Sequence, residues 1–447
     1  MMAEGMRPSG VEWIGDIPVS WKMGRLRYLA SFESGATPSK DISDFWDGEI
    51  PWVSSQEVKT DVLTDTSLHI SVKAVESCST RLLPEGTVVM VARSGILQHT
   101  LPVALLACPM TVNQDIKALT FNDQVLGKFF LYFVKGNNDN LLKVLLKDKS
   151  TVDNISFDYL LSLRVPVPPI EEQERITKYL DTFCKSVEFC IGSIERQIDL
   201  LERYRSSVIH EAVTKGLDSN VPMKPSGAEW VHSVPESWRV EPLKYHCSMF
   251  KGLPILKTDL VEEGVPVISY GQIHSKDNTG AHLDDSLLRF IPANRVSGSE
   301  SSKLQRGDVV FADTSEDVEG IGNAALIDTD DVVYAGYHTV TCRSDQTSLS
   351  GRYLAYLART DAWRYQLRNL AMGVKVFSIT QAILRKAEVL LPPRDEQERI
   401  TDFLDDRCSA IDAVINTKRK QLDVLKKRRQ SLIYEYVAGK RRVGTKG

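Results

Sequence analysis

The chain contains the same sequence frame twice, and this duplication constrains its fold more than any other feature. The segment "PSGVEWIGDIPVSWKMGRLRYLA" from Pro8 to Ala30 returns as "PSGAEWVHSVPESWRVEPLKYHC" from Pro225 to Cys247, at an offset of 217 residues. The segment "PPIEEQERITKYLD" from Pro168 to Asp181 returns as "PPRDEQERITDFLD" from Pro392 to Asp405, at an offset of 224. Because the ends of the halves match better than their middles, the sequence predicts two related halves with a shared frame and different centres.

A long helix is predicted at the end of each half. Prolines at 166, 168 and 169 close the segment before the first helix, since a residue before proline is pushed out of helical space. Apolar residues then recur at the three- and four-residue spacing of a helix with a coiled-coil seam, and Gly216 and Gly439 are natural helix ends. The predicted seam consists of Ile176, Leu180, Phe183, Val187, Ile194, Ile198, Leu201, Ile400, Leu404, Ile411, Leu422, Leu425 and Leu432.

The remaining parts contain short β-rich runs between short helical stretches, which predicts an α+β fold for each. We expect globular domains at 1–165 and 218–389, the first long helix within 166–217, and the second with a C-terminal tail within 390–447. The order globular, helix, globular, helix favours antiparallel pairing of the two helices. Helices of ~45 residues would then form a rod of roughly 65 Å with a globular part near each end. In that arrangement Ile176 lies near Leu432 or Tyr436, and Leu201 faces the region of Ile411.

Composition excludes several classes of protein. The 447 residues are 42% hydrophobic and 26% charged, which is ordinary for soluble globular domains. No apolar run has the length of a membrane span, and the first residues lack the pattern of a secretory signal, so a cytoplasmic location is expected. Seven cysteines show no Cys-x-x-Cys spacing, which argues against a structural zinc site. The net charge of −4 does not indicate a nucleic-acid binder.

The sequence predicts no catalytic site and no bound metal or cofactor. The Pro-Pro pairs follow Val167 and Leu391, not the Asp or Asn of an amino-methyltransferase loop, and no GxxxxGK[ST] phosphate loop is present. Asp47 with Glu57–Lys59 imitates the acidic residues and lysine of a metal-dependent nuclease. That pattern is short and has no copy in the second half, so it is an unfavoured alternative.

The doubled opening "SGVEWIGDIP..W" and "SGAEWVHSVP..W", with the paired "PP..EQERI" helix starts, resembles the specificity subunit of type I restriction-modification enzymes over essentially the whole chain. The resemblance implies two target-recognition domains that each read one half of a bipartite double-stranded DNA site, joined by two antiparallel spacer helices. It also implies docking of two modification (adenine methyltransferase) subunits and, through the complex, of restriction (translocase and nuclease) subunits. S-adenosylmethionine, ATP and Mg²⁺ are then expected in those partners.

Candidate DNA contacts are polar or small residues beside the β-rich runs. Arg and Lys suit guanine edges, and Asn and Gln suit adenine, by bidentate geometry in the major groove. The globular halves are slightly acidic, so a DNA-facing surface is expected to be locally basic. The candidates are Thr37, Ser39, Lys40, Ser54, Ser55, Gln56, Arg93, Ser94, Asn113 and Gln114 in the first half, and Ser269, Tyr270, Gln272, Thr314, Ser315, His338 and Lys375 in the second.

Two charged segments have alternative interpretations. The acidic residues of "EEQER" and "DEQER" are either a solvated first turn favoured by the helix dipole or part of a subunit-docking face. The basic stretch Lys418–Arg429 is either a solvated helix face or a track for DNA phosphates. A pure scaffold without DNA reading is the general alternative to a recognition subunit.

Overall fold

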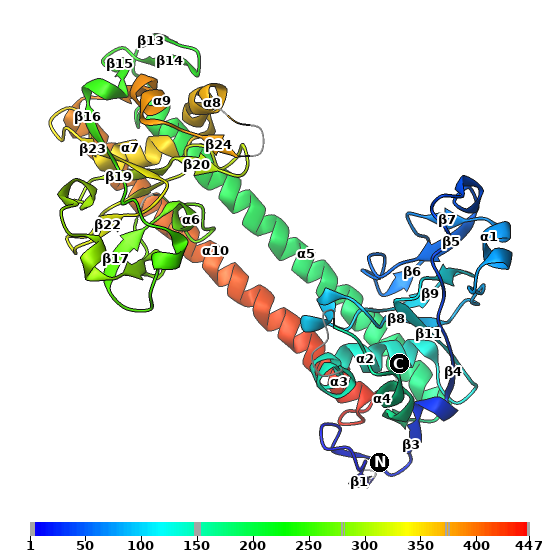
Figure 1. Ribbon diagram of the computed structural model, residues 1–447. Coiled ribbons are helices and arrows are strands. Elements are labelled where there is room, and N and C mark those ends of the chain that lie inside the picture. The colour runs from blue at the N-terminus through cyan, green and yellow to red at the C-terminus, as the bar shows by residue number, and fades with distance from the viewer. Residues whose placement is uncertain are drawn as a thin grey trace. The chain divides into compact units, whose positions relative to one another are not determined.

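The computed structural model describes residues 5–146, 153–278, 280, 282–371, 373 and 376–444. The chain forms two compact units, unit 1 from residues 1–194 with 420–447 and unit 2 from residues 195–419. Both long helices, α5 (Ile170–Lys215) and α10 (Arg394–Val437), contribute to both units (Figure 1). Each unit is therefore a globular part with the beginning of one long helix and the end of the other. The domain limits expected from the sequence place each long helix in a segment of its own, apart from the globular domains. These limits stay a prediction.

Unit 1 is a mixed α and β structure built around one five-stranded sheet in the order β4-β11-β8-β9-β6. Helix α2 packs against β8 and β9 of this sheet (Figure 1). The elements of unit 1 before α5 are β1 (Met6–Pro8), β2 (Asp16–Pro18), β3 (Lys22–Arg25), β4 (Ala30–Glu33), β5 (Ile50–Val53), β6 (Val62–Leu63), β7 (His69–Ile70), α1 (Val72–Ser77), β8 (Val88–Val91), β9 (Val103–Leu106), β10 (Thr111–Val112), β11 (Ile116–Phe121), α2 (Gly127–Gly136), α3 (Asn138–Leu145), α4 (Phe157–Ser162) and β12 (Arg164–Val167).

Unit 2 repeats this plan around a four-stranded sheet in the order β16-β23-β19-β21. Helix α7 packs against β19 and β21, as α2 packs in unit 1. The elements between α5 and α10 are β13 (Met223–Ala228), β14 (Val231–Pro235), β15 (Arg239–Pro242), β16 (Cys247–Lys251), β17 (Val265–Ile268), α6 (Tyr270–Ile273), β18 (Arg289–Ile291), β19 (Val309–Ala312), β20 (Thr314–Ser315), β21 (Ala324–Leu326), β22 (Tyr334–Ala335), β23 (Thr339–Ser344), α7 (Gly351–Ala358), α8 (Asp361–Leu370), β24 (Phe377–Ser378), α9 (Gln381–Lys386) and β25 (Glu388–Leu391).

The long helices run antiparallel to each other within each unit. In unit 1 the ring of Tyr179, near the start of α5, lies 4.7 Å from that of Tyr436, near the end of α10. In unit 2 the guanidinium of Arg419 lies 3.1 Å from Glu202, towards the other end of α5. Ile176 belongs to the same buried cluster as Leu432 and Tyr436, whereas Ile400 belongs to the core of unit 2.

Burial of the expected helix seam depends on position along the helices. The residues near a globular part or on the buried face of α10 are almost fully buried, namely Ile176, Leu180, Val187, Ile400, Leu404, Ile411, Leu422 and Leu432. The residues Phe183, Ile194, Ile198, Leu201 and Leu425 are only half-buried. Leu201 and Leu425 belong to the expected seam but are not fully buried in it.

The glutamine and glutamate shared by the two "EQER" repeats pack inside the molecule at the start of each long helix. Gln173 is fully buried; its Oε1 accepts from the backbone N–H of Leu126 at 2.9 Å, and its amide donates to two carbonyls. Gln397 repeats this with the backbone N–H of Ser350 at 2.8 Å. Glu172 is 5% exposed and accepts from the indole of Trp21. Neither the solvated cap nor the docking face describes Glu172, because its carboxylate is bonded inside the unit.

A second repeated contact ties each globular part to the long helix that follows it. In unit 1 the carboxylate of Asp181 accepts from the hydroxyl of Tyr132 at 2.8 Å and pairs with Lys128. In unit 2 Asp405 accepts from Tyr356 at 2.5 Å and pairs with Arg352.

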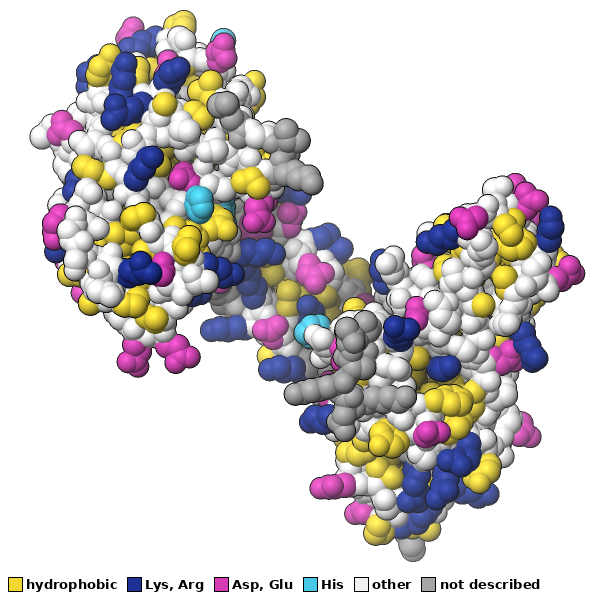
Figure 2. Space-filling view, in the orientation of Figure 1, with side chains coloured by type: hydrophobic (Ala, Val, Ile, Leu, Met, Phe, Trp, Pro, Cys, Tyr) yellow, Lys and Arg dark blue, Asp and Glu magenta, His cyan; other side chains and the backbone are white. Residues whose placement is uncertain are grey.

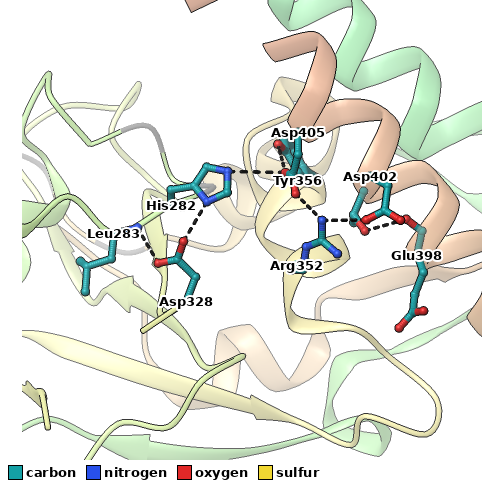
Figure 3. Close-up of polar contacts among 9 residues, drawn as sticks. His282, Leu283, Asp328, Arg352, Tyr356, Glu398, Asp402 and Asp405 are labelled. Carbon is teal, nitrogen blue, oxygen red and sulfur yellow. Dashed lines mark hydrogen bonds and ion pairs between the residues drawn. The ribbon is translucent and has the colours of Figure 1, made fainter. Parts of the chain in front are cut away.

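Unit 2 adds a histidine to this contact. The ring of His282 lies between Asp328, at 2.8 Å, and Asp405, at 3.6 Å (Figure 3). The interaction with Asp405 is the main reason that the pKa of His282 rises to about 9, with a further contribution from the hydrogen bond to Asp328. The imidazole is therefore charged at neutral pH. It connects its loop both to α10 and to the turn that follows β21.

Candidate nucleic-acid interface

Several candidate DNA-contacting residues of unit 1 lie where the strands of a small parallel pair end. β5 and β10 run parallel, with Trp52 opposite Thr111 and Val53 opposite Val112. Ser54, Ser55 and Gln56 follow β5 directly, and Asn113 and Gln114 follow β10. Because the carboxyl ends of parallel strands meet at the same edge, the two segments emerge side by side.

Unit 2 places its candidates in the same way. β17 and β22 run parallel, with Val267 opposite Tyr334 and Ile268 opposite Ala335. Ser269 and Tyr270 follow β17, and His338 comes shortly after β22. The register makes Ser269 the counterpart of Ser54.

A third segment joins this edge in each unit. Arg93 and Ser94 come after β8, and Thr314 and Ser315 come after β19, the corresponding central strand. Both segments then pair with the chain that leads back to the long helix, since Arg93 bridges Asn154 and Thr314 pairs with Ser378. Arg93 and Ser94 therefore occupy the place in unit 1 that Thr314 and Ser315 occupy in unit 2.

The first-half loop "GATPSK" is held against this edge by specific bonds. Thr37 Oγ1 donates to Gln114 Oε1 at 2.7 Å, which joins two of the candidates. The indoles of Trp52 and Trp46 donate to the carbonyls of Ala36 and Ser39, both at 3.0 Å. Gly35 begins the loop because a Cβ there would lie 1.6 Å from the carbonyl oxygen of Val112. Thr37, Ser39, Lys40, Gln56, Arg93 and Gln114 are all exposed.

In unit 2 the same edge carries a cluster of aromatic and histidine rings. The ring of Tyr270 lies 5.5 Å from Tyr337 and 5.4 Å from His338, both tilted edge to face. His274 lies 6.2 Å from Tyr270, and its Nε2 lies 2.8 Å from the carbonyl oxygen of Thr314. Tyr337 and His274 were not among the sequence candidates. Tyr337 could have been found, because it follows β22 as Gln114 follows β10.

His338 has an unusual backbone. Its φ of 55° is the only left-handed value at a non-glycine residue in the described part of the chain. Such a conformation costs of order 1 kcal/mol for a residue with a Cβ and clusters at functional sites. The imidazole Nδ1 lies 3.2 Å from Asp313 Oδ1 and 3.3 Å from Thr314 Oγ1, which orients the exposed ring.

The hollow beside this cluster is acidic. Its volume is about 420 Å³, and it is lined by Tyr270 and His274 together with Glu316, Asp317 and Glu319. The expectation that the DNA-facing surface is locally basic stays a prediction, and this acidic hollow does not support it. On the face shown in Figure 2, basic and acidic side chains are interspersed over both units. Carboxylates at such an edge are suited to accept from the amino group of cytosine and are unsuited to contact phosphates.

Some candidates are used inside the units. Asn113 is 5% exposed, and its side chain bonds both the carboxylate and the backbone N–H of Asp115. Ser269 is fully buried and Ser315 is 2% exposed; Gln272 Oε1 accepts from the Ser269 backbone N–H at 3.2 Å. Contacts of these four residues with DNA stay predictions that their burial and bonding disfavour. Lys375 lies outside the described residues.

The nuclease-like residues do not form a metal centre in the described part of the chain, where no group of three or more His, Cys, Asp or Glu side chains converges. Glu57 accepts instead from the hydroxyl of Ser67. In the same part of the chain, no helix is both long enough and apolar enough to cross a bilayer.

Comparison with known proteins decides the family. The family model described as the type I restriction modification DNA specificity domain matches residues 18–197 and again residues 251–424. The chain belongs to the type I restriction-modification specificity subunits. The two matches correspond to the two halves of the internal repeat.

Relatives of this specificity subunit include the EcoR124I/EcoR124II specificity subunit of Escherichia coli, which is 31% identical over 44% of this chain and spans half of that protein. The MjaVIII specificity subunit of Methanocaldococcus jannaschii is 22% identical over 96% of this chain and 94% of its own length. A solved structure from a study of complex assembly in the type I R-M system superposes with a TM-score of 0.69 at 16% identity, over 94% of this chain and 98% of that one. This likeness supports the two-part mixed helix and strand fold.

Proposed function

We propose that this specificity subunit reads a bipartite DNA site, one half with each unit. The observation that carries the proposal is the repeated edge, where the ends of two parallel strands and the segment after a central strand meet in both units. In unit 1 that edge presents Gln56, Arg93 and Gln114, and in unit 2 it presents Tyr270, Tyr337 and His338. Because these side chains differ between the units, the two half-sites differ in sequence.

Exchange of one recognition segment tests this proposal directly. Residues 31–150 of this chain are replaced by the corresponding segment of another family member, and the complex is assembled with its modification and restriction subunits. Methylation-sensitive sequencing then reports the modified site. One half-site should change while the other is kept. A change in both half-sites, or a loss of all binding by a folded chimera, would refute separate reading.

We propose that α5 and α10 form a coiled-coil spacer that sets the distance between the half-sites. A straight helix of 46 residues is about 69 Å long, roughly two turns of duplex at ~34 to 36 Å each. Inserting one heptad into each helix keeps the apolar seam in phase and lengthens the pair by ~10 Å, or about three base pairs. The recognised spacer should lengthen by that amount, and an unchanged spacer in an active variant would show that the helices do not set it.

The chemistry is proposed to reside in the partner subunits. Two modification subunits would supply adenine methylation with S-adenosylmethionine, and restriction subunits would supply ATP-dependent translocation and cleavage with Mg²⁺, in the cytoplasm. The purified chain alone should neither methylate nor cut DNA. Methyl transfer or Mg²⁺-dependent cleavage by the isolated chain would overturn this. A pure scaffold, the alternative, would assemble the partners yet leave the choice of DNA sequence unchanged in the exchange experiment.

A further inference from the structure

Unit 2 contains a polar hollow between α5 and the globular part. Its volume is about 180 Å³, enough for a small ion with water. The polar side chains that line it are Arg359, Arg364, Ser206, Ser275, Asn278 and Asn323. None of these side chains is acidic.

Both arginines are partly buried. Burial lowers the pKa of Arg359, and the nearby charge of Arg205 lowers it further. Burial lowers the pKa of Arg364 to about 10, with contributions from Arg368 and Arg359. Both guanidinium groups still carry their charges at neutral pH. Two partly buried positive charges in one hollow are costly unless an anion neutralises them.

The carboxylates near these arginines are bound elsewhere. Asp412 pairs with Arg205, and Asp361 pairs with Arg368 at 3.0 Å. Arg364 donates from Nε to the carbonyl of Ala358 at 2.6 Å, which contributes no net charge. Within the described ranges no carboxylate forms an ion pair with Arg359 or Arg364, and the adjoining residues outside those ranges, Thr279 and Ala281, are uncharged by sequence.

Unit 1 provides an internal comparison. The offset of 224 residues relates Arg359 to Lys135, and Ser206 and Ile209 of α5 to Gln430 and Ile433 of α10. Lys135, Gln430 and Ile433 likewise line one hollow together. There the ammonium of Lys135 is paired with the carboxylate of Asp61. The charge of Lys135 is thus paired within unit 1, whereas in the described part of unit 2 its counterpart Arg359 has no carboxylate partner.

We propose that the hollow of unit 2 binds an oxyanion of the phosphate type, held by Arg359 and Arg364. Ser206 lies at its rim, where its hydroxyl donates to the carbonyl of Glu202 at 3.1 Å. The planar guanidinium fork matches two oxygens of such an anion. The anion is either free in solution or a phosphodiester of bound DNA. Only the DNA source rests on the proposed function.

Thermal unfolding of the full chain tests the free anion. The melting temperature is measured in rising inorganic phosphate against chloride of equal ionic strength. In the natural chain it should rise and then saturate, because phosphate binds the folded state. Arg359→Gln should weaken the phosphate response about tenfold or more.

A carboxylate placed in the hollow serves as the second variant. Ser206→Glu should abolish the phosphate response and raise the melting temperature without phosphate, because the new carboxylate replaces the anion. Ser207→Glu adds the same charge at the neighbouring position, which is exposed like Ser206 but does not line the hollow. This variant should respond to phosphate as the natural chain does. Both serines lie on α5, so a general effect of a new carboxylate on the folding of this helix would change the two variants alike. A difference between the two variants therefore reports on the hollow.

DNA binding by the assembled complex tests the phosphodiester. If inorganic phosphate gives no shift, Arg359→Gln and Ser206→Glu should each reduce the slope of log affinity against log salt by about one. The proposal is overturned if neither measurement shows an effect. It is also overturned if the variants lose only subunit assembly, which would identify an acidic protein segment as the occupant. A phosphate response in a chain that reads no DNA would refute the proposed function and leave the anion site intact.

Discussion

The indole N–H of Trp21 donates to the carboxylate of Glu172 at 3.0 Å, and Trp238 donates to Glu396 at 3.1 Å in the second unit. Each bond joins the two sequence motifs that make up the repeat, the tryptophan of the opening segment and the glutamate of the helix start. In unit 1 the guanidinium of Arg442 also reaches Glu172, at 2.6 Å. The matched ends of each half are therefore in contact in the folded chain.

Trp21→Phe should destabilise unit 1 through this bond. The ring volume is partly kept, but a buried carboxylate loses a donor, which costs about 1 to 3 kcal/mol. Thermal unfolding followed by hydrogen exchange in α5 would report the loss. Trp238→Phe is the matched variant and should loosen α10 at its start instead. Equal protection in both helices after either substitution would contradict the assignment.

Truncation along the helix pair should follow burial. Ile176 and Leu404 are fully buried, so Ile176→Ala and Leu404→Ala should each cost ~2 to 5 kcal/mol. Leu201→Ala and Leu425→Ala should cost less than half of this, because their side chains are half-buried. Urea unfolding of the four variants gives the order. Equal free-energy costs for all four variants would show that Leu201 and Leu425 are as fully buried in solution as Ile176 and Leu404.

His282 should make the stability of unit 2 depend on pH. Its pKa is raised from 6.5 to about 9 in the folded state, so folding favours the protonated ring. The contribution is fully present below pH 6.5 and is lost as the pH rises through 9. The side chain is 56% exposed, so solvent screening limits the effect to about 1 kcal/mol.

The measurement compares the natural chain with His282→Gln at pH 6 and pH 9.5. The difference in melting temperature should be larger at pH 6 and should nearly vanish at pH 9.5. The comparison removes the titration of other groups, which both chains share. A difference that is the same at both values would contradict the role of the two aspartates.

His338→Gly should separate recognition from folding. Glycine adopts a φ of 55° without strain, so the melting temperature should change little or rise. The loss of the exposed imidazole should lower DNA affinity at the second half-site by about 1 to 3 kcal/mol. Gln114→Ala is the matched variant and should affect the first half-site. An unchanged preference in His338→Gly would remove this ring from the interface.

The sequence predicted the repeated frame of this molecule better than the strand-end edges that carry the candidate DNA contacts. Prolines at 166, 168 and 169 and the glycines at 216 and 439 mark the helix limits, because each acts on its local backbone. The parallel pairs β5 with β10 and β17 with β22 join segments about 60 residues apart in strands of two to four residues, and so short a run has no periodicity to read. The left-handed backbone of His338 also has no sequence signature.

The contacts at the end of α10 bear on the order in which the two halves are encoded. In unit 1, Gly439 after α10 lies against Pro18, and Pro18 pairs with Met6 in the first strand. In unit 2, the chain runs directly from Gly216 after α5 to Met223, which pairs with Pro235 in the same way. A short connection from 444 to 5, with new ends opened between 217 and 222, would give a circular permutant with the same contacts. If each unit reads one half-site, as proposed, the permutant encodes the two readers in reversed order along the gene while it recognises the same DNA sequence.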